Sequence, residues 1–504
     1  MAIELSNIIF TDQDDIVPSC GVEQILNTGV ANTLAGNDVI TGTGGEYGIF
    51  NSGTLNTTDG NDVITGVHNL PEENPFSGYG IYNIGSIYTG EGNDIITGTS
   101  ETVVDFGSRI GIFTVESTID TGDGDDVITG ISKIGTGIFM RDSTINTGDG
   151  NDTITGIVEL RDFGLDGINS YNSTIINTGD GNDSITGTSL SYYGIVMSYA
   201  SILDTGSGND IITGTAGYAG IGNFSNSSFN TGEGNDTITG NSSGGGYDGN
   251  GIINGGFMDT GDGDDIINAE ASGSFLNGFA TGLFNGESAT GFLYTGEGND
   301  SLSGISTAEN GIGIRNITNL NTGNGNDFIS GTGTQYSISN SGSIDTGDGD
   351  DIITSTGVIY NEGVINTGDG NDKILVNGGA EGLVLGYGIY NKYGTIITGN
   401  GNDIIIANEG FESGLDSSGA WFLGEGDDYI KGYGSGDFYG GDGEDTLELM
   451  PGTYTVGIWG EAGESPIFTK GDQLMITSEF EKLKAGSTIY DFSSLTSGQI
   501  ITVA

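Results

Sequence analysis

The chain has 504 residues, of which 97 are glycine and only 5 are proline. So much glycine excludes an ordinary globular core, and the absence of a strict triplet period excludes a collagen helix. The 69 acidic residues outnumber the 11 lysines and arginines and give a net charge of −58, which argues against nucleic acids and anionic membranes as partners and favours cations.

Residues 1–30 precede the first repeat and are expected to form an N-terminal cap. They contain no basic segment followed by a long apolar run, and no stretch of the chain approaches the roughly 20 apolar residues of a membrane helix. The sequence therefore predicts neither a cleaved signal peptide nor a membrane span.

Cys20 and His68 are the only cysteine and the only histidine. One residue of each kind excludes a disulfide framework, a zinc cluster and a Cys/His catalytic pair within one chain. Both are interpreted as ordinary residues of a coil or a loop.

A hexapeptide recurs between residues 31 and 445, the range predicted to form the repeat domain. Its representative copy is Thr147-Gly148-Asp149-Gly150-Asn151-Asp152, and these residues define positions one to six. The strict pattern Thr-Gly-x-Gly-[Asn/Asp]-Asp occurs twelve times, and four looser copies lie at the ends of the array, where stacked-repeat proteins change sequence. Position six is occupied by Asp38, Asp62, Asp94, Asp126, Asp152, Asp183, Asp210, Asp236, Asp265, Asp300, Asp327, Asp351, Asp372, Asp403, Asp428 and Asp445.

The residue types of the hexapeptide indicate a tight turn. Its two glycines suit backbone with positive φ, and the apolar residue two positions after the last aspartate starts a short strand with its side chain inward. Such a turn points carbonyl oxygens and a carboxylate into one small space. Oxygen ligands in that number favour Ca²⁺, which takes about six to eight of them, over softer metals.

The segment from Gly148 to Thr155 resembles the RTX (repeats-in-toxin, hemolysin-type) nonapeptide, with Thr147 in place of its first glycine. The resemblance implies that turn carbonyls and the sixteen position-six aspartates hold Ca²⁺ between successive coils, with up to about fifteen ions in fifteen gaps. It also indicates a bacterial source, cyanobacteria included. One departure is that the family places nonapeptides in tandem, whereas here one copy appears every 17 to 35 residues. This spacing favours a larger coil with one calcium-binding corner.

Between the turns the sequence follows a fixed order: Gly-Ile-x-Asn, a short Ser/Thr-Ile strand, the acidic turn, and x-Ile-x-Gly. In six copies the Asn lies eleven residues before the last Asp of the turn, as in Asn83 and Asp94. We therefore predict an all-β fold, a right-handed parallel β-helix or β-solenoid of about 16 coils. Each coil has roughly three short strands, one variable corner and an asparagine ladder at a constant corner.

The apolar residue of each short strand is predicted to point into the core. The expected inward rows are Ile81, Ile112, Ile138, Ile168 and Ile195 from the first strand, Ile119, Ile145, Ile175 and Ile202 from the second, and Ile96, Ile128, Ile154 and Ile185 from the third. Aromatic residues beside the Gly-Ile step form an outward stripe that suits either structural stacking, which we favour, or carbohydrate binding: Phe50, Tyr82, Phe113 and Phe139.

Residues 446–504 break this order and are predicted to form a C-terminal β cap. Their end, residues 489–504, resembles the C-terminal region of bacterial RTX exoproteins, which implies export through a type I channel. A plain cap without an export role is the alternative. The expected location is therefore extracellular or at the cell surface.

Stacking the turns would bring equivalent aspartates about 4.8 Å apart, and each like-charge neighbour would cost roughly 1 kcal/mol even in water. Fifteen Ca²⁺ ions would supply +30 and leave about −28 of the net −58. The array is therefore expected to fold poorly without its metal.

The sequence favours a non-enzymatic, calcium-binding extracellular scaffold, with other copies of itself or a surface polysaccharide as partners. A carbohydrate or cell adhesin that uses the variable corner is the alternative. A polysaccharide lyase or epimerase is disfavoured because Arg109, Arg141, Arg161 and Arg315 are scattered and no catalytic region remains. Ice binding by the turns is disfavoured because position three is acidic in twelve copies and lacks threonine elsewhere: Ala35, Ser207, Asn324 and Asn400.

Overall fold

A computed structural model describes residues 2–18, 23–69, 77–102, 109–160, 165–244, 248–273, 279–287, 290–377, 387–413, 419–460 and 465–504. Cys20 and Arg161 lie outside these ranges. The chain forms two compact units, Met1–Asp262 and Gly263–Ala504.

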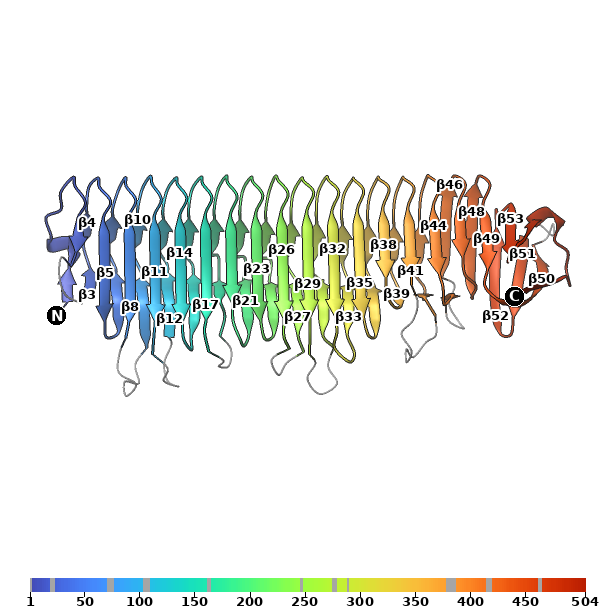
Figure 1. Cartoon of the computed structure of the whole chain (residues 1–504), viewed down its shortest axis with the longest axis horizontal. Coiled ribbons are helices and arrows are strands. Elements are labelled where there is room, and N and C mark those ends of the chain that lie inside the picture. The colour runs from blue at the N-terminus through green and yellow to red at the C-terminus, as the bar shows by residue number, and fades with distance from the viewer. Residues whose placement is uncertain are drawn as a thin grey trace. The chain divides into compact units, whose positions relative to one another are not determined.

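The first unit is a parallel β-solenoid, in which every coil contributes one strand to each of three sheets (Figure 1). The first sheet holds β1 (Ala2–Glu4), β3 (Gln24–Asn27), β6 (Tyr47–Asn51), β9 (Gly78–Asn83), β12 (Arg109–Val115), β15 (Thr136–Arg141), β18 (Ile168–Tyr171), β21 (Tyr193–Ser198), β24 (Ala219–Asn223) and β27 (Asn250–Asn254). The second sheet holds β4 (Val30–Asn32), β7 (Thr54–Asn56), β10 (Ser86–Tyr88), β13 (Thr118–Asp120), β16 (Thr144–Asn146), β19 (Ile175–Asn177), β22 (Ile202–Asp204), β25 (Ser228–Asn230) and β28 (Phe257–Asp259). The third sheet holds β2 (Ile16–Val17), β5 (Val39–Gly44), β8 (Val63–His68), β11 (Ile95–Ser100), β14 (Val127–Ser132), β17 (Thr153–Val158), β20 (Ser184–Thr188), β23 (Ile211–Ala216) and β26 (Thr237–Ser242).

The second unit repeats this arrangement as far as residue 412, where the first sheet ends. Its first sheet holds β30 (Thr281–Asn285), β33 (Ile312–Asn316), β36 (Tyr336–Asn340), β39 (Ile359–Asn361), β42 (Ile389–Asn391) and β45 (Phe411–Glu412). Its second sheet contains β31 (Phe292–Tyr294), β34 (Asn319–Asn321), β37 (Ser343–Asp345), β40 (Val364–Asn366), β43 (Thr395–Ile397), β46 (Ala420–Glu425) and β48 (Gly436–Asp442). Its third sheet contains β29 (Ile266–Ala271), β32 (Ser301–Ser306), β35 (Phe328–Gly333), β38 (Ile352–Ser355), β41 (Lys373–Val376), β44 (Ile404–Ala407), β47 (Tyr429–Lys431) and β49 (Thr446–Leu449).

The parallel pattern changes near the C-terminus. There β50 (Gly452–Trp459) pairs in antiparallel fashion with β51 (Ser465–Lys470) and β55 (Ile500–Val503), and β51 pairs with β52 (Gln473–Ser478). On the third sheet β53 (Lys482–Ala485) follows β49 and pairs with β54 (Thr488–Asp491). Two short 3₁₀ helices, η1 (Leu5–Asn7) and η3 (Phe492–Ser494), complete the described elements.

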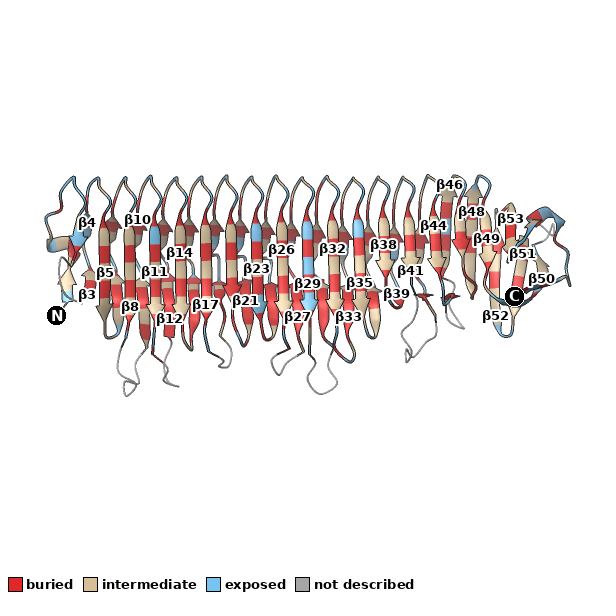
Figure 2. Cartoon of the chain, in the orientation of Figure 1, coloured by how far each residue is buried: buried red, intermediate tan, exposed pale blue. Residues whose placement is uncertain are grey.

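The strands are in register, so equivalent residues of successive coils lie side by side. In the third sheet Ile128 is aligned with Ile154, and Ile154 with Ile185. All three side chains are fully buried, because alternate residues of a strand face opposite sides and the inward row fills the narrow space between the sheets. Figure 2 shows the resulting alternation of buried and less buried residues along each strand.

The predicted inward rows are confirmed for the first and third strands, and for Ile119 and Ile145 of the second. They are wrong for Ile175 and Ile202, which are 38% and 40% exposed, whereas their neighbours Ile176 and Leu203 are fully buried. The register is fixed by the distance to the turn, since Ile176 lies two residues before Thr178 just as Ile145 lies two before Thr147. A shift of one residue moves a side chain to the opposite face.

The predicted asparagine ladder lies between the first and second strands of several coils. The side-chain amide of Asn316 donates to Oδ1 of Asn340 at 2.8 Å, and Asn340 donates to Asn361 at 2.8 Å. In the first unit Asn27, Asn51 and Asn83 are linked in the same way. Each amide is buried, so the ladder satisfies polar groups that would otherwise lose their hydrogen bonds to water.

The inward isoleucines provide a direct test of the fold. Replacing Ile154 by Ala should lower the free energy of unfolding by about 2–5 kcal/mol, because it leaves a cavity in a fully packed row. Replacing the adjacent outward residue, Thr155, by Ala should change it by no more than about 0.5 kcal/mol. Urea unfolding of both variants at saturating Ca²⁺ would compare them, and equal losses would contradict the assigned faces.

Candidate metal centre

The acidic hexapeptides form the turns between the second and third sheets, one turn per coil. In the representative turn Gly148 and Gly150 have φ angles of +80° and +153°, which favour glycine. A Cβ atom on either residue would lie 2.1 Å or 1.8 Å from the carbonyl oxygen of Gly122 or Gly124 in the preceding coil. The glycines are therefore required both by the turn and by the close approach of neighbouring coils.

All sixteen position-six aspartates lie where the sequence predicts them, in one column per unit, and each is at most 2% exposed. Their Oδ1 atoms accept hydrogen bonds from the preceding coil. The backbone N–H of Asp126 donates to Oδ1 of Asp152 at 2.8 Å, and that of Asp152 donates to Asp183 at 2.7 Å. The carboxylates thus form an inner ladder that links successive turns.

Position five forms a second ladder on the exposed side of the turn, and this ladder points the opposite way. The backbone N–H of Asn151 donates to Oδ1 of Asp125 in the preceding coil at 2.9 Å, and that of Asn182 donates to Asn151 at 3.1 Å. An amide or carboxylate oxygen serves equally well as acceptor, which explains why the sequence has Asn or Asp here.

The second carboxylate oxygen, Oδ2, has a different environment. In some coils the hydroxyl of the position-one threonine donates to it, as Thr295 does to Asp300 at 2.6 Å. In many others Oδ2 is buried and has no hydrogen-bond partner among the described residues: Asp62, Asp94, Asp126, Asp152, Asp183, Asp210, Asp327, Asp372, Asp403, Asp428 and Asp445. Buried anionic oxygens of this kind are costly unless a cation or a proton compensates them.

Burial raises the pKa of these carboxyl groups well above the ordinary value of 3.8. The pKa reaches about 7 for Asp62 and Asp152 and about 8 for Asp351, and neighbouring aspartates of the column add to the effect of burial. The nearby hydroxyl of the position-one threonine and the backbone N–H groups lower the pKa, but their effect is weaker. Without a counter-ion the ladder therefore takes up protons near neutral pH.

The donor set of the turn fits a hard cation. Within the described ranges no three acidic, histidine or cysteine side chains converge into a metal site, so a cation would need backbone ligands in addition to the carboxylate. The carbonyl oxygens of Gly148 and Gly150 accept no hydrogen bond from the described part of the chain. One carboxylate and several backbone carbonyls are typical ligands of Ca²⁺.

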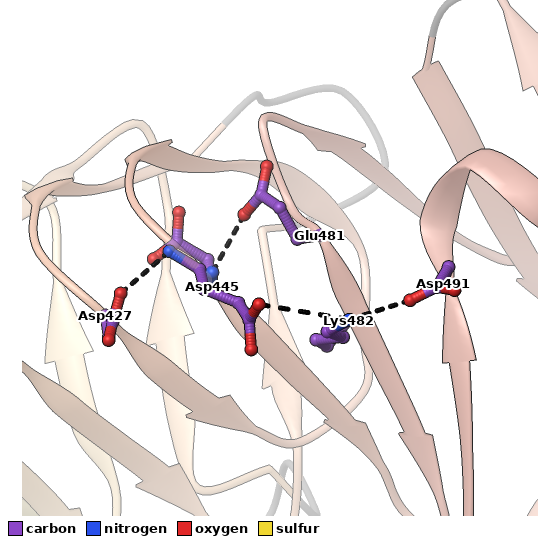
Figure 3. Close-up of polar contacts among 6 residues, drawn as sticks. Asp427, Asp445, Glu481, Lys482 and Asp491 are labelled. Atoms are coloured by element: carbon purple, nitrogen blue, oxygen red, sulfur yellow. Dashed lines mark hydrogen bonds and ion pairs between the residues drawn. The ribbon is translucent and has the colours of Figure 1, made fainter.

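The ends of the ladder were missed by the sequence interpretation. At the start, the backbone N–H of Asp15 donates to Asp38 at 2.8 Å, so the acidic segment before Ile16 also forms a turn of this kind. At the other end Glu481 replaces the aspartate and accepts from the N–H of Asp445 at 2.8 Å (Figure 3). The sequence Asp14-Asp15-Ile16-Val17 is the signal that identifies the first of these.

The aromatic stripe is a stacked ladder along the outer face of the first sheet. The ring centroids of Tyr82 and Phe113 are 4.8 Å apart, and those of Phe113 and Phe139 are 5.3 Å apart with planes only 7° from parallel. The ring faces therefore cover one another and mainly their edges face outward.

His68 is buried beside Ser100, and its Nδ1 atom lies 3.0 Å from the serine hydroxyl. Burial lowers the pKa of His68 to about 4.

Comparison with known proteins gives a likeness in structure only. A scan of family models finds no match, and a search of curated proteins finds none either. Among solved structures two chains match, and one is the crystal structure of a hyperactive, Ca²⁺-dependent, β-helical antifreeze protein from an Antarctic bacterium. It is 14% identical with a TM-score of 0.30, over 98% of this chain and 95% of that one. These values are too low for that protein's ligand to bear on this chain.

No helix in the described residues is long and apolar enough to cross a membrane.

The raised pKa values predict an unusual pH dependence of stability in the absence of metal. A carboxyl group whose pKa is higher in the folded than in the unfolded state stabilises the fold when it is protonated. This contribution is complete below about pH 4 and is lost as the pH rises through 6 to 8, the range of the pKa values of Asp94, Asp152 and Asp351.

Thermal unfolding in EDTA should therefore show a higher midpoint at pH 5 than at pH 8. Saturating Ca²⁺ should reduce this difference, because protons and the cation compete for the same oxygens. A midpoint in EDTA that is constant or rises with pH would contradict the burial of charged carboxylates.

Proposed function

We propose that the protein is a calcium-binding structural solenoid without enzymatic activity, whose folding depends on Ca²⁺ bound at the acidic turns. The observation that carries the proposal is the column of buried carboxylates, many with an Oδ2 atom that has no hydrogen-bond partner. Backbone carbonyls of the glycine turn lie in the same segment. A cation supplies the charge that this arrangement lacks.

In each turn the ligands would be Oδ2 of the position-six aspartate together with backbone carbonyls of the hexapeptide, such as those of Gly148 and Gly150. The cation supplies positive charge and joins oxygen ligands. The chain's own contribution is to hold those oxygens in register, because Oδ1 is already fixed by the N–H of the preceding coil. The inner ladder thus orients each carboxylate and leaves its other oxygen available.

Dependence of folding on Ca²⁺ suits a secreted scaffold. Sites with a Kd of about 10⁻⁴–10⁻³ M are empty in a low-calcium cytosol and fill outside the cell. The unfolded chain would cross a type I channel and fold after export, with its C-terminal residues as the export signal. This part of the proposal rests on the resemblance of residues 489–504 to RTX exoproteins.

Carbohydrate adhesion is less well supported. The stacked aromatic ladder offers ring edges rather than open ring faces, so it gives little area on which a sugar ring can stack. The longest variable corners lie partly outside the described residues.

Ice binding is a second candidate function, and a feature of this chain's own structure favours it. The acidic turns are unsuitable, but the outer face of the third sheet in the first unit carries a continuous row of threonines and no charge.

The calcium proposal is tested by titrating EDTA-treated protein with Ca²⁺ while following far-UV circular dichroism, with Mg²⁺ as the control. We expect β-structure to form between roughly 0.1 and a few mM Ca²⁺, with on the order of fifteen ions bound. A metal-free chain that is fully folded at neutral pH and binds one or two ions would refute the proposal.

A triple variant, Asp126→Asn, Asp152→Asn and Asp183→Asn, separates the two roles of the carboxylates. The amide oxygen still accepts the hydrogen bond from the preceding coil, whereas the buried charge is lost. We expect the metal-free protein to become more stable and to bind fewer Ca²⁺ ions, as counted by equilibrium dialysis.

The matched control removes the same charge from the exposed position three by Asp123→Asn, Asp149→Asn and Asp180→Asn. It should leave the number of bound ions unchanged. Equal loss of Ca²⁺ from the two triple variants would show that the column is not the site.

A further inference from the structure

The outer face of the third sheet in the first unit differs from the rest of this acidic molecule. In the eight strands from β5 to β26, alternate residues point outward and form three rows in register. We call them the threonine face: Val39, Val63, Ile95, Val127, Thr153, Ser184, Ile211 and Thr237; Thr41, Thr65, Thr97, Thr129, Thr155, Thr186, Thr213 and Thr239; Thr43, Val67, Thr99, Ile131, Ile157, Thr188, Thr215 and Asn241. None is charged, although the chain has a net charge of −58.

The middle row consists of threonine in every one of these eight coils. Thr97 is aligned with both Thr65 and Thr129, and Thr129 is aligned with Thr155. Since strands lie about 4.8 Å apart, a hydroxyl and a methyl group recur at that interval along the face. Figure 1 shows the strands of this sheet lying side by side in one direction.

The threonine hydroxyls of this row are available to a ligand. In the described part of the chain Thr97, Thr129 and Thr155 make no side-chain hydrogen bond, and they are partly exposed. Threonine is β-branched and has few rotamers, so little conformational entropy is lost when a ligand fixes it. The face is therefore a preorganised array.

The composition of the face restricts what it can bind. It has no charge with which to attract an ion, and a second copy would bring its own net charge of −58. It has no aromatic side chain on which a sugar ring could stack. The partner must be uncharged, extended and periodic, because the same contact is repeated once per coil.

We propose that the threonine face binds the surface of ice. The methyl groups restrict the orientation of adjacent water, and the hydroxyls, repeated in register, give that water fixed hydrogen-bond partners. Charged groups would bind their own hydration shells and disturb a water lattice, and this face has none. The inference rests on the calcium proposal only in that the coils must be folded.

The test uses the full-length, Ca²⁺-loaded protein and measures thermal hysteresis and partition into slowly grown ice. A triple variant, Thr97→Lys, Thr129→Lys and Thr155→Lys, should reduce both by about tenfold or more, because bulky charges interrupt three adjacent contacts. The control places the same residues on the second sheet by Thr54→Lys, Thr118→Lys and Thr144→Lys, which are also partly exposed. It should retain the wild-type values.

A milder triple variant, Thr97→Val, Thr129→Val and Thr155→Val, keeps the shape of the side chains and removes only the hydroxyls. It should lose part of the partition into ice with unchanged circular dichroism, which keeps the test informative if the lysine variant does not fold.

Three results would overturn the inference. The first is exclusion of the folded wild-type protein from ice to the same extent as a protein that does not bind ice. The second is a wild-type dimer in sedimentation that the lysine substitutions dissociate, which would identify the face as an interface between copies. The third is binding of the wild-type protein to microcrystalline cellulose through this face and not to ice. Activity on ice in a chain that is already folded in EDTA would instead refute the calcium proposal and leave this one intact.

Discussion

One buried carboxylate per coil is the constraint on which the rest of this structure depends. Each position-six aspartate uses one oxygen to hold the preceding coil, and its other oxygen is buried in the same turn. The hydrogen bond requires the carboxylate to be inside the turn, and its position there raises the cost of its charge. The glycines follow from this, since neighbouring turns must approach so closely that a Cβ atom has no room.

The ladder also explains how regular coils tolerate irregular lengths. The ladder bond between Asp428 and Asp445 spans 17 residues of sequence, and the one between Asp265 and Asp300 spans 35, yet their lengths are 2.9 Å and 2.8 Å. In the longer of these coils the extra residues lie on both sides of β30, between Ala271 and Thr281 and between Asn285 and Phe292. Such insertions leave the acidic turns in register because each turn is held by its own side-chain ladder.

Most of the fold could be predicted because a short-range pattern is repeated many times. The turn, the three strands and the asparagine ladder each follow from local spacing, and repetition removes the ambiguity of a single copy. The misassigned Ile175 shows the limit of such a prediction. Two adjacent isoleucines leave it undecided which of them faces the core until the distance to the turn is counted.

The site was harder to predict. The sequence indicates which carboxylates gather but not that they are buried, and Glu481 replaces an aspartate with no motif around it. The sequence alone does not identify the threonine face, because a threonine in a strand is also explained by ordinary β propensity.

The two ladders of the turn reach in opposite directions, the inner one toward the preceding coil and the outer one toward the next. Every coil therefore presents one donor and one acceptor to the coil before it and one of each to the coil after it, regardless of its length. Deleting or duplicating a whole coil within a unit would rejoin identical hydrogen-bonding partners, and only the end coils need distinct sequences. Such a gene can change the length of its product by recombination between repeats without passing through an unfoldable intermediate.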